Sequence, residues 1–186
     1  LGSRLADFQG SDITLTVDYN IQYLAEKLLK QAEADLKIEG GVIIVIEPSS
    51  GKVLALANLP NFDPNEYFQE KDFQVFQNDA LQKIFEPGSV FKPITMAAAL
   101  DKGKITPQTI YFDQGCLNIS GYRVCNYEQR IYAGELTMTN VLEKSINTGA
   151  VFAESQAGHK SFLDYIEKFG IFEKTGIDLA GEISSS

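Results

Sequence analysis

The chain has 186 residues, of which 44% are hydrophobic, and a formal net charge of −9 at pH 7. This length and composition predict one domain, or one domain with a piece of another, that has enough apolar residues for a core. The acidic charge argues against nucleic acid and against an anionic membrane surface as main partners. No apolar run reaches membrane-spanning length.

The first third of the chain predicts a strand, a helix and a strand hairpin, in that order. Alternating β-branched residues predict a short strand over 13–17, and Asp18 is placed to cap a helix over about 20–37. The continuous apolar run 42–46 predicts a strand buried on both faces, which pairs with a return strand over 52–57. The irregular stretch that follows, 59–85, is long for a compact domain and therefore favours a functional loop.

The stretch 86–101 predicts a turn followed by a helix, with reactive side chains at the start of the helix. Ser89 follows a Pro-Gly turn and is placed to cap the helix, and Pro93 falls in its first turn. Ser89 and Lys92 then share one face of the helix N-terminus, where a hydroxyl nucleophile and an amine base can meet. Burial and the helix dipole both favour the neutral amine that such a base requires. An apolar stripe at helical spacing continues the helix: Val90, Phe91, Ile94, Ala97, Ala98 and Leu100.

A Ser-x-x-Lys tetrad alone is weak evidence, because it occurs by chance in about half of chains of this length. Taken alone, it favours a capping serine beside a solvated lysine. The turn before Ser89 and the long apolar helix behind Lys92, which would bury the lysine stem, favour a reactive pair instead.

Two cysteines flank Ser120-Gly121, which predicts a hairpin turn. Cys116 and Cys125 would form a disulfide across this hairpin in an oxidising compartment, and two buried free thiols are an equal alternative. One cysteine pair and the single histidine, His159, do not supply four ligands for zinc, so we expect no metal site and no cofactor.

The last third of the chain predicts three helices. Thr137 is placed to cap the first, which ends near Ser145–Gly149. Helical patterns then cover 149–157 and about 160–168, and Phe169-Gly170 ends the last one.

Several separate stretches, in the right order, resemble the transpeptidase domain of a penicillin-binding protein from about Asp12 to Glu182. The sequence around Ser89 resembles the active-site motif of that family, and Ser145-Ile146-Asn147 matches its second motif, Ser-x-Asn. The resemblance is to the monofunctional class B type, with a lean toward division and spore-type members. The matching stretches are Leu15–Asp18, Gly41–Pro48, Gly51–Ala55, Phe62–Asn65, Phe85–Pro93, Ser145–Gly149 and Phe169–Glu182.

The resemblance implies an α/β fold of the α+β type, the β-lactamase/transpeptidase-like fold, present as its N-terminal part. It places a partial transpeptidase domain at 12–183, a linker or the end of a preceding domain at 1–11, and a tail at 184–186. It also implies an extracytoplasmic location, with an N-terminal membrane anchor in the parent protein that lies outside this sequence.

The resemblance further implies a peptidoglycan D,D-transpeptidase. Ser89 would attack the D-Ala-D-Ala carbonyl of a stem peptide, Lys92 would take its proton, and Ser145 would relay a proton to the leaving amine. Asn147 would hold Lys92 and the substrate amide, and the backbone N–H of Ser89 would form half of the oxyanion hole. The implied partners are peptidoglycan stem peptides, β-lactam antibiotics, and cell-wall synthesis or division proteins.

The sequence departs from the family at its third motif, Lys-Thr-Gly or Lys-Ser-Gly followed by a small hydroxyl residue on a strand. Lys174-Thr175-Gly176 matches the tripeptide itself. However, it follows the end of a helix rather than opening a strand, and Ile177 stands where the small hydroxyl residue belongs. We therefore expect the third motif and the C-terminal strands of the sheet to be missing, and the chain alone to be inactive or nearly so. The edge of the Val42 strand would then be open and would recruit a partner.

Two other readings remain at this point. One is a serine β-lactamase-type hydrolase, which needs a deacylating base that no carboxylate of this sequence identifies. The other is a catalytically incomplete binding or scaffold relative. The presence of all four site residues argues against it: Ser89, Lys92, Ser145 and Asn147.

Overall fold

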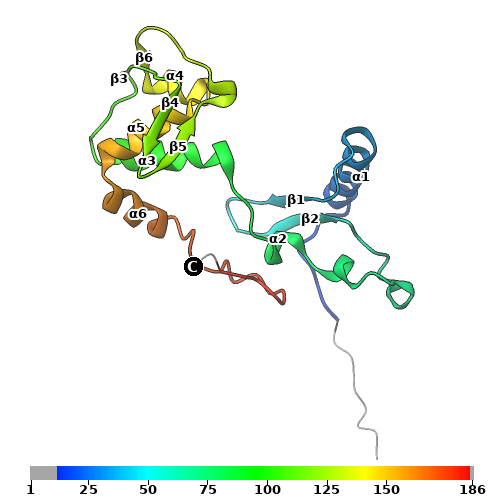
Figure 1. Ribbon diagram of the computed structural model, residues 1–186. Helices are drawn as coiled ribbons and strands as arrows, with labels where there is room; N and C mark the ends of the chain where they lie inside the picture. Colours follow the sequence, from blue (N-terminus) through cyan, green and yellow to red (C-terminus); the bar gives the residue numbers. More distant parts are fainter. Residues whose placement is uncertain (1–11, 185–186) are drawn as a thin grey trace, which may run out of the picture. The chain divides into compact units, whose positions relative to one another are not determined.

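In the computed structural model, which describes residues 12–184, the chain divides between Lys83 and Ile84 into two compact units. Figure 1 shows both, with helices and strands in each. The predicted linker over 1–11 and residues 185–186 of the predicted tail lie outside the described residues. None of the helices within 12–184 is long and apolar enough to cross a membrane.

The first unit packs one helix against one hairpin (Figure 1). Helix α1 (Tyr19–Leu36) starts at Asp18, whose carboxylate accepts hydrogen bonds from the backbone N–H groups of Asn20 and Ile21, as predicted. Strands β1 (Gly41–Ile46) and β2 (Val53–Leu59) pair antiparallel, with Val45 opposite Ala55. A core joins the helix to the hairpin; its buried members are Ala25, Leu29, Ala55, Ala57 and Leu59.

Two predictions for the first unit are wrong. Strand β1 is not buried on both faces: Ile44 is 45% exposed and Ile46 is 52% exposed, because α1 covers one face of a sheet of two strands. Residues 13–17 form no strand, because this segment makes isolated hydrogen bonds to β2 rather than a ladder. Thr16 Oγ1 donates to the Val53 carbonyl, and the Asp18 N–H donates to the Leu54 carbonyl.

Within the described residues, β1 pairs with β2 alone, so its other edge is free of strand partners. That a further segment or chain fills this edge stays a prediction. The stretch after β2 holds two short 3₁₀ helices, Tyr67–Gln69 and Phe73–Phe76, and the one-turn helix α2 (Asp79–Gln82).

The second unit is mainly helical and carries two small antiparallel sheets. A 3₁₀ turn over Gly88–Phe91 leads into α3 (Lys92–Asp101), and β3 (Ile110–Tyr111) pairs with β6 (Leu136–Thr137). Strands β4 (Cys116–Ile119) and β5 (Tyr122–Cys125) form the predicted hairpin, and the short 3₁₀ turn Tyr127–Gln129 follows them. The remaining helices are α4 (Met138–Glu143), α5 (Asn147–Ala157) and α6 (His159–Lys168).

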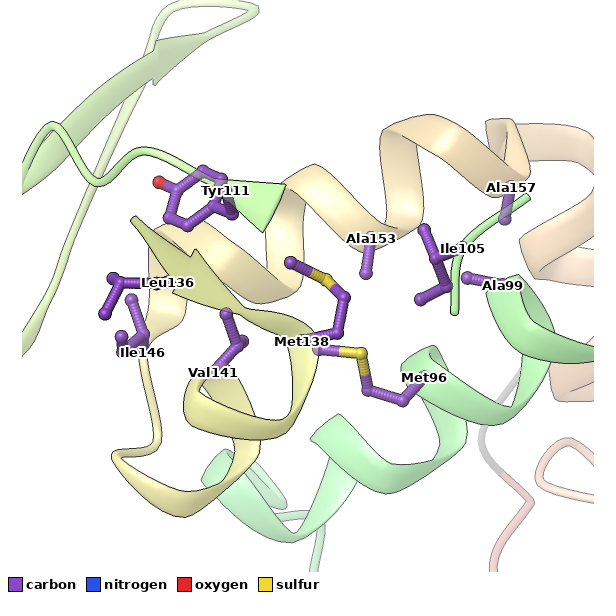
Figure 2. Packing of buried hydrophobic residues seen from close by; sticks show 10 residues of the cluster. All are labelled: Met96, Ala99, Ile105, Tyr111, Leu136, Met138, Val141, Ile146, Ala153 and Ala157. Atoms are coloured by element: carbon purple, nitrogen blue, oxygen red, sulfur yellow. The ribbon is translucent and has the colours of Figure 1, made fainter. Parts of the chain in front are cut away.

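One apolar core holds these elements together, as Figure 2 shows. Helix α4 begins with the predicted Thr137 cap, which forms a reciprocal pair of hydrogen bonds with Asn140. Gly149 lets α5 approach α4 closely, because a Cβ at this position would lie 2.5 Å from Val141 Cγ2. The core residues come from α3 to α5 and the segments between them: Met96, Ala99, Ile105, Tyr111, Leu136, Met138, Val141, Ile146, Ala153 and Ala157.

The predicted apolar stripe over 90–100 is right only in part: Ala98 is buried as predicted, but the two ends of the stripe are exposed. Val90 is 75% exposed and Leu100 is 40% exposed, whereas Met96 and Ala99 face the core. The reason is that the α-helix starts at Lys92, after a 3₁₀ turn with fewer residues per turn, so the periodicity counted from Val90 is displaced.

Lys174-Thr175-Gly176 lies in an irregular segment after α6 and opens no strand. Its backbone N–H groups at Thr175 and Gly176 donate to the Glu182 carboxylate. This placement agrees with the rejection of this tripeptide as the third motif.

Candidate active site

The local backbone brings Ser89 and Lys92 together. Gly88 has a φ of +63°, a conformation that favours glycine, and Ser89 follows it inside the 3₁₀ turn. Side chains three residues apart eclipse one another in a 3₁₀ helix, so Ser89 lies in line with Lys92. Ser89 does not cap α3 as predicted; its Oγ lies 3.3 Å from Lys92 Nζ and 2.9 Å from Ser145 Oγ.

Lys92 is the centre of the site. It is 8% exposed, and its Nζ lies 2.6 Å from the Ser145 carbonyl oxygen, 2.9 Å from Ser145 Oγ and 2.6 Å from Asn147 Oδ1. Every one of these contacting groups is neutral, and none of the ion pairs within residues 12–184 includes Lys92. Burial without a counter-ion lowers the pKa of the Lys92 amine.

Ser145 reaches the lysine with two atoms because of its backbone. It follows the end of α4 with a φ of +53°, in the left-handed region that non-glycine residues rarely adopt. Its N–H donates to the Leu142 carbonyl at 3.1 Å, and the N–H of Ile146 donates to the Val141 carbonyl at 2.9 Å, so the turn is held by α4. This turn lets both the carbonyl and the hydroxyl of Ser145 contact Lys92 Nζ.

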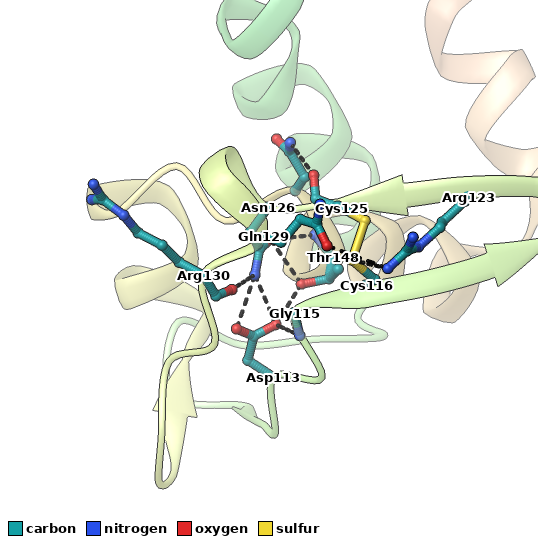
Figure 3. Close-up of a disulfide and its surroundings, with 10 residues drawn as sticks. Asp113, Gly115, Cys116, Arg123, Cys125, Asn126, Gln129, Arg130 and Thr148 are labelled. Atoms are coloured by element: carbon teal, nitrogen blue, oxygen red, sulfur yellow. Dashed lines mark hydrogen bonds between the residues drawn. A yellow bond between two sulfur atoms is a disulfide. The ribbon is translucent and has the colours of Figure 1, made fainter.

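All four predicted site residues therefore meet at one point, and further groups hold one of them, Asn147, in place. The side-chain amide of Asn147, the first residue of α5, donates to the Cys125 carbonyl at 2.7 Å. Cys125 forms a disulfide with Cys116, with Cα atoms 4.0 Å apart, so of the two open alternatives the disulfide forms. Behind it lies a polar cluster of Asp113, Asn126 and Thr148, shown in Figure 3.

The geometry has the parts of a site for acyl transfer through a serine. The hydroxyl of Ser89, the Lys92 amine with its lowered pKa and the hydroxyl of Ser145 lie within hydrogen-bonding distance of one another. No group of three or more histidine, cysteine or carboxylate side chains within the described residues is placed to hold a metal ion.

Comparison with known proteins decides the family. The family described as the penicillin binding protein transpeptidase domain matches residues 41–186. The chain belongs to this family. It is 35% identical to stage V sporulation protein D of Bacillus subtilis and 31% identical to the peptidoglycan D,D-transpeptidase FtsI of Escherichia coli, each alignment covering 93% of the chain. It spans 27% and 29% of the length of those relatives.

The fold comparison agrees. The TP domain of penicillin-binding protein 3 from Burkholderia pseudomallei superimposes with a TM-score of 0.76 and 27% identity, over 94% of this chain and 47% of that one. The predicted fold class is therefore confirmed, as is the class B transpeptidase resemblance with its lean toward division and sporulation members.

Proposed function

We propose that this chain carries the acyl-serine site of a peptidoglycan D,D-transpeptidase, with Ser89 as nucleophile, Lys92 as base, Ser145 as proton relay and Asn147 as substrate-binding residue. One observation carries the proposal: Ser89 Oγ, Ser145 Oγ and Asn147 Oδ1 all contact the single buried amine of Lys92. The name of the Escherichia coli relative, a peptidoglycan D,D-transpeptidase, supports the same activity.

The partners of Lys92 fit a neutral amine. Such an amine has two N–H donors and one lone pair, whereas an ammonium has three donors and no lone pair. The Ser145 carbonyl and Asn147 Oδ1 can only accept, and at 2.6 Å they are the nearest partners. With both N–H groups donated to them, the lone pair is left for a hydroxyl proton of Ser89 or Ser145, which is the state that a general base requires.

The proposed reaction has two stages. Ser89 Oγ forms a bond to the carbonyl carbon of the D-Ala-D-Ala peptide bond while Lys92 takes its proton. The C–N bond then breaks as Ser145 gives its hydroxyl proton to the departing D-Ala amine and takes the proton held by Lys92, and the backbone N–H of Ser89 contributes to the oxyanion hole. An amine from a second stem peptide then forms a bond to the carbonyl carbon of this ester, the bond from that carbon to Ser89 Oγ breaks, and the proton lost by the amine returns to Ser89 Oγ. A β-lactam acylates the same serine through its own ring C–N bond, and this acyl-enzyme persists because its ester hydrolyses slowly.

The remaining functional assignments follow from this proposal. The partners are stem peptides, β-lactams and the proteins of cell-wall synthesis or division. The location is extracytoplasmic, which the disulfide supports because such bonds persist in oxidising compartments. The 186-residue chain expressed alone should acylate slowly, since the family's third motif and the second oxyanion donor lie outside it; one such donor is worth about 10²–10³ in rate.

The test uses a fluorescent penicillin with the full-length protein that contains this chain. The label should map to Ser89 by peptide mass, disappear in Ser89→Ala, and remain in a Ser155→Ala control, whose hydroxyl bonds the Phe152 carbonyl instead. Covalent labelling of the Ser89→Ala protein would overturn the proposal. Multiple-turnover release of hydrolysed β-lactam, without transfer of a donor peptide to an acceptor amine, would favour the hydrolase reading.

A further inference from the structure

The amide of Asn147 is held at both ends, and the two contacts fix its orientation. Its Oδ1 accepts from Lys92 Nζ at 2.6 Å, and its Nδ2 donates to the Cys125 carbonyl at 2.7 Å. Asn147 is also the first residue of α5, and the residue before it, Ile146, supplies no side-chain cap. The place of this amide therefore depends on whatever else holds the start of α5 and the Cys125 carbonyl.

A buried asparagine from another segment supplies the missing cap. Asn126 Oδ1 accepts from the backbone N–H of Thr148 at 3.1 Å and lies 3.0 Å from Thr148 Oγ1. Both residues are nearly inaccessible, with Asn126 4% exposed and Thr148 0% exposed. Because the unsatisfied N–H groups at a helix start need acceptors, Asn126 anchors the first turn of α5 from outside the helix.

Asp113 in turn fixes both of these side chains (Figure 3). Its two carboxylate oxygens each accept from Asn126 Nδ2 at 2.9 Å, and Oδ1 accepts from Thr148 Oγ1 at 2.7 Å. Backbone N–H groups of Gly115 and Tyr132 donate to the same carboxylate at 3.0 and 2.8 Å. Within residues 12–184 no lysine or arginine pairs with it, so it is held entirely by neutral donors.

The peptide between Cys125 and Asn126 completes the link. Its carbonyl accepts from Asn147 Nδ2, and its N–H donates to the Gly115 carbonyl at 2.9 Å. Gly115 is also one of the backbone donors to Asp113. Asp113 thus orders both the start of α5 and the carbonyl that orients the Asn147 amide.

We propose that Asp113, acting through Asn126 and Thr148, is a positioning residue that places the Asn147 amide against Lys92 during acylation. Asp113 contacts neither Ser89 nor Lys92, so its effect on the reaction passes through Asn147. The inference rests on the proposed function, in which Lys92 activates Ser89.

The test compares Thr148→Val with Thr148→Ser in the full-length protein that contains this chain. Valine keeps the shape of threonine but removes the hydroxyl, whereas serine keeps the hydroxyl. Small displacements of groups that hold a reacting residue cost up to about 10²-fold in rate, so acylation by penicillin per folded molecule should fall about 10- to 100-fold in Thr148→Val and stay near the parent rate in Thr148→Ser.

The pH dependence separates positioning from a loss of stability. The polar neighbours of Lys92, which are Ser89, Ser145 and Asn147, are neutral, so the acidic limb of the acylation rate reports on Lys92. Moving the Asn147 acceptor away from Lys92 disfavours the ammonium, so this limb should move to lower pH in Thr148→Val. Thr148→Val leaves the Asp113 charge in place, so the movement would not be a charge effect. Asp113→Asn should reproduce the slower acylation.

Ile105→Val is the stability control, because Ile105 belongs to the apolar core of this unit and is not one of the polar residues of this cluster. It should lower the melting temperature without moving the rate per folded molecule or the acidic limb. Parent-like acylation and an unmoved limb in both Thr148→Val and Asp113→Asn would overturn the inference, even if both variants melt earlier. Labelling of Ser89→Ala would instead overturn the proposed function, so the two failures are distinguishable.

Discussion

Lys92 and Asp113 are two titratable side chains of the same unit that are surrounded by neutral hydrogen-bonding partners. Burial is the first influence on each pKa, but the outcomes differ. For Lys92, burial lowers the pKa of the amine and nothing offsets it. For Asp113, burial would raise the pKa, but hydrogen bonds from Thr148, Tyr132, Gly115 and Asn126 outweigh it, and the pKa of the carboxyl is lowered.

The difference shows how one polar region can hold a reactive group beside a fixed one. The partners of Lys92 include two hydroxyls that can exchange a proton with it, so its charge is free to change. The partners of Asp113 all donate, so its charge is stabilised. Adjacent residues of α5, Asn147 and Thr148, connect the two groups. The predictions below test whether this division between a reactive and a fixed charge holds.

The largest expected effect comes from Lys92→Met, which keeps the apolar stem and removes the amine. Acylation by penicillin should fall about 10²–10⁴-fold, the usual contribution of a general base, as measured by labelling kinetics. Lys144→Met is a matched control, because Lys144 directly precedes Ser145 in the sequence but its Nζ lies over the Tyr132 ring. Rapid labelling of the Lys92→Met protein would show that the amine is not the base.

The difference in stability between the unmodified protein and Lys92→Met should depend on pH in a predictable direction. Because the pKa of Lys92 is lower in the folded state, the unfolded state binds the proton more tightly and protonation opposes folding. The free-energy cost of folding with a protonated Lys92 is largest below the folded-state pKa, and it disappears as pH rises toward the ordinary lysine value. The stability of the parent relative to Lys92→Met should therefore increase on that rise.

The sequence predicted Lys92 but not Asp113, and the reason is the range of the signals. The helix cap at Asp18, the cap at Thr137 and the Ser120-Gly121 turn depend on residues within a few positions, so local patterns predict them. That Ser89 and Ser145 belong to one site was predicted only from the resemblance to a family. Asp113 contacts Thr148 across 35 positions, and no spacing or periodicity encodes such a contact.

Asp113→Ala should have the next largest effect, on stability. It leaves the backbone N–H donors of Gly115 and Tyr132 without their acceptor, and Asn126 Nδ2 keeps only its bond to the Arg130 carbonyl; one unsatisfied buried donor costs about 1–3 kcal/mol. We expect the unfolding free energy at neutral pH to fall by about 3 kcal/mol, measured by urea unfolding. The exposed Asp164→Ala on α6 should change it little.

This loss should fade in acid. The pKa of Asp113 is lower when folded than when unfolded, so its contribution is present above the ordinary aspartate value of about 3.9. It is lost as pH falls through the folded-state pKa. A gap between parent and Asp113→Ala that stayed constant down to strongly acidic pH would contradict a fixed negative charge.

Reduction of the Cys116–Cys125 disulfide should have a smaller effect. The bond spans a separation of nine residues, and closing so short a loop contributes about 2–3 kcal/mol. The fold should survive, with a lower midpoint in urea. Acylation should change little, because the Cys125–Asn126 peptide keeps its contacts to Gly115 and Asn147. A loss of acylation as large as in Thr148→Val would assign the positioning to the disulfide rather than to Asp113.

The smallest expected effect separates the two atoms with which Ser145 contacts Lys92. Ser145→Ala and Ser145→Gly both remove the hydroxyl, and both keep the backbone carbonyl that lies 2.6 Å from Lys92 Nζ. They differ in backbone strain, because a Cβ in the left-handed region costs about 1–2 kcal/mol and glycine has none. Ser145→Gly should therefore be more stable than Ser145→Ala by about 1 kcal/mol in thermal unfolding, although glycine's greater freedom in the unfolded chain reduces the gap.

The acylation rates of Ser145→Ala and Ser145→Gly show whether the left-handed backbone of Ser145 contributes to acylation. If the hydroxyl relays a proton, both variants should acylate more slowly than the parent, and by a similar factor, because both lack it. If the left-handed turn matters mainly by aiming the carbonyl at Lys92, Ser145→Gly should acylate more slowly than Ser145→Ala, because glycine lets the peptide turn away. Equal rates with unequal stabilities would place the function of Ser145 in its hydroxyl and leave the carbonyl as the fixed acceptor that holds Lys92.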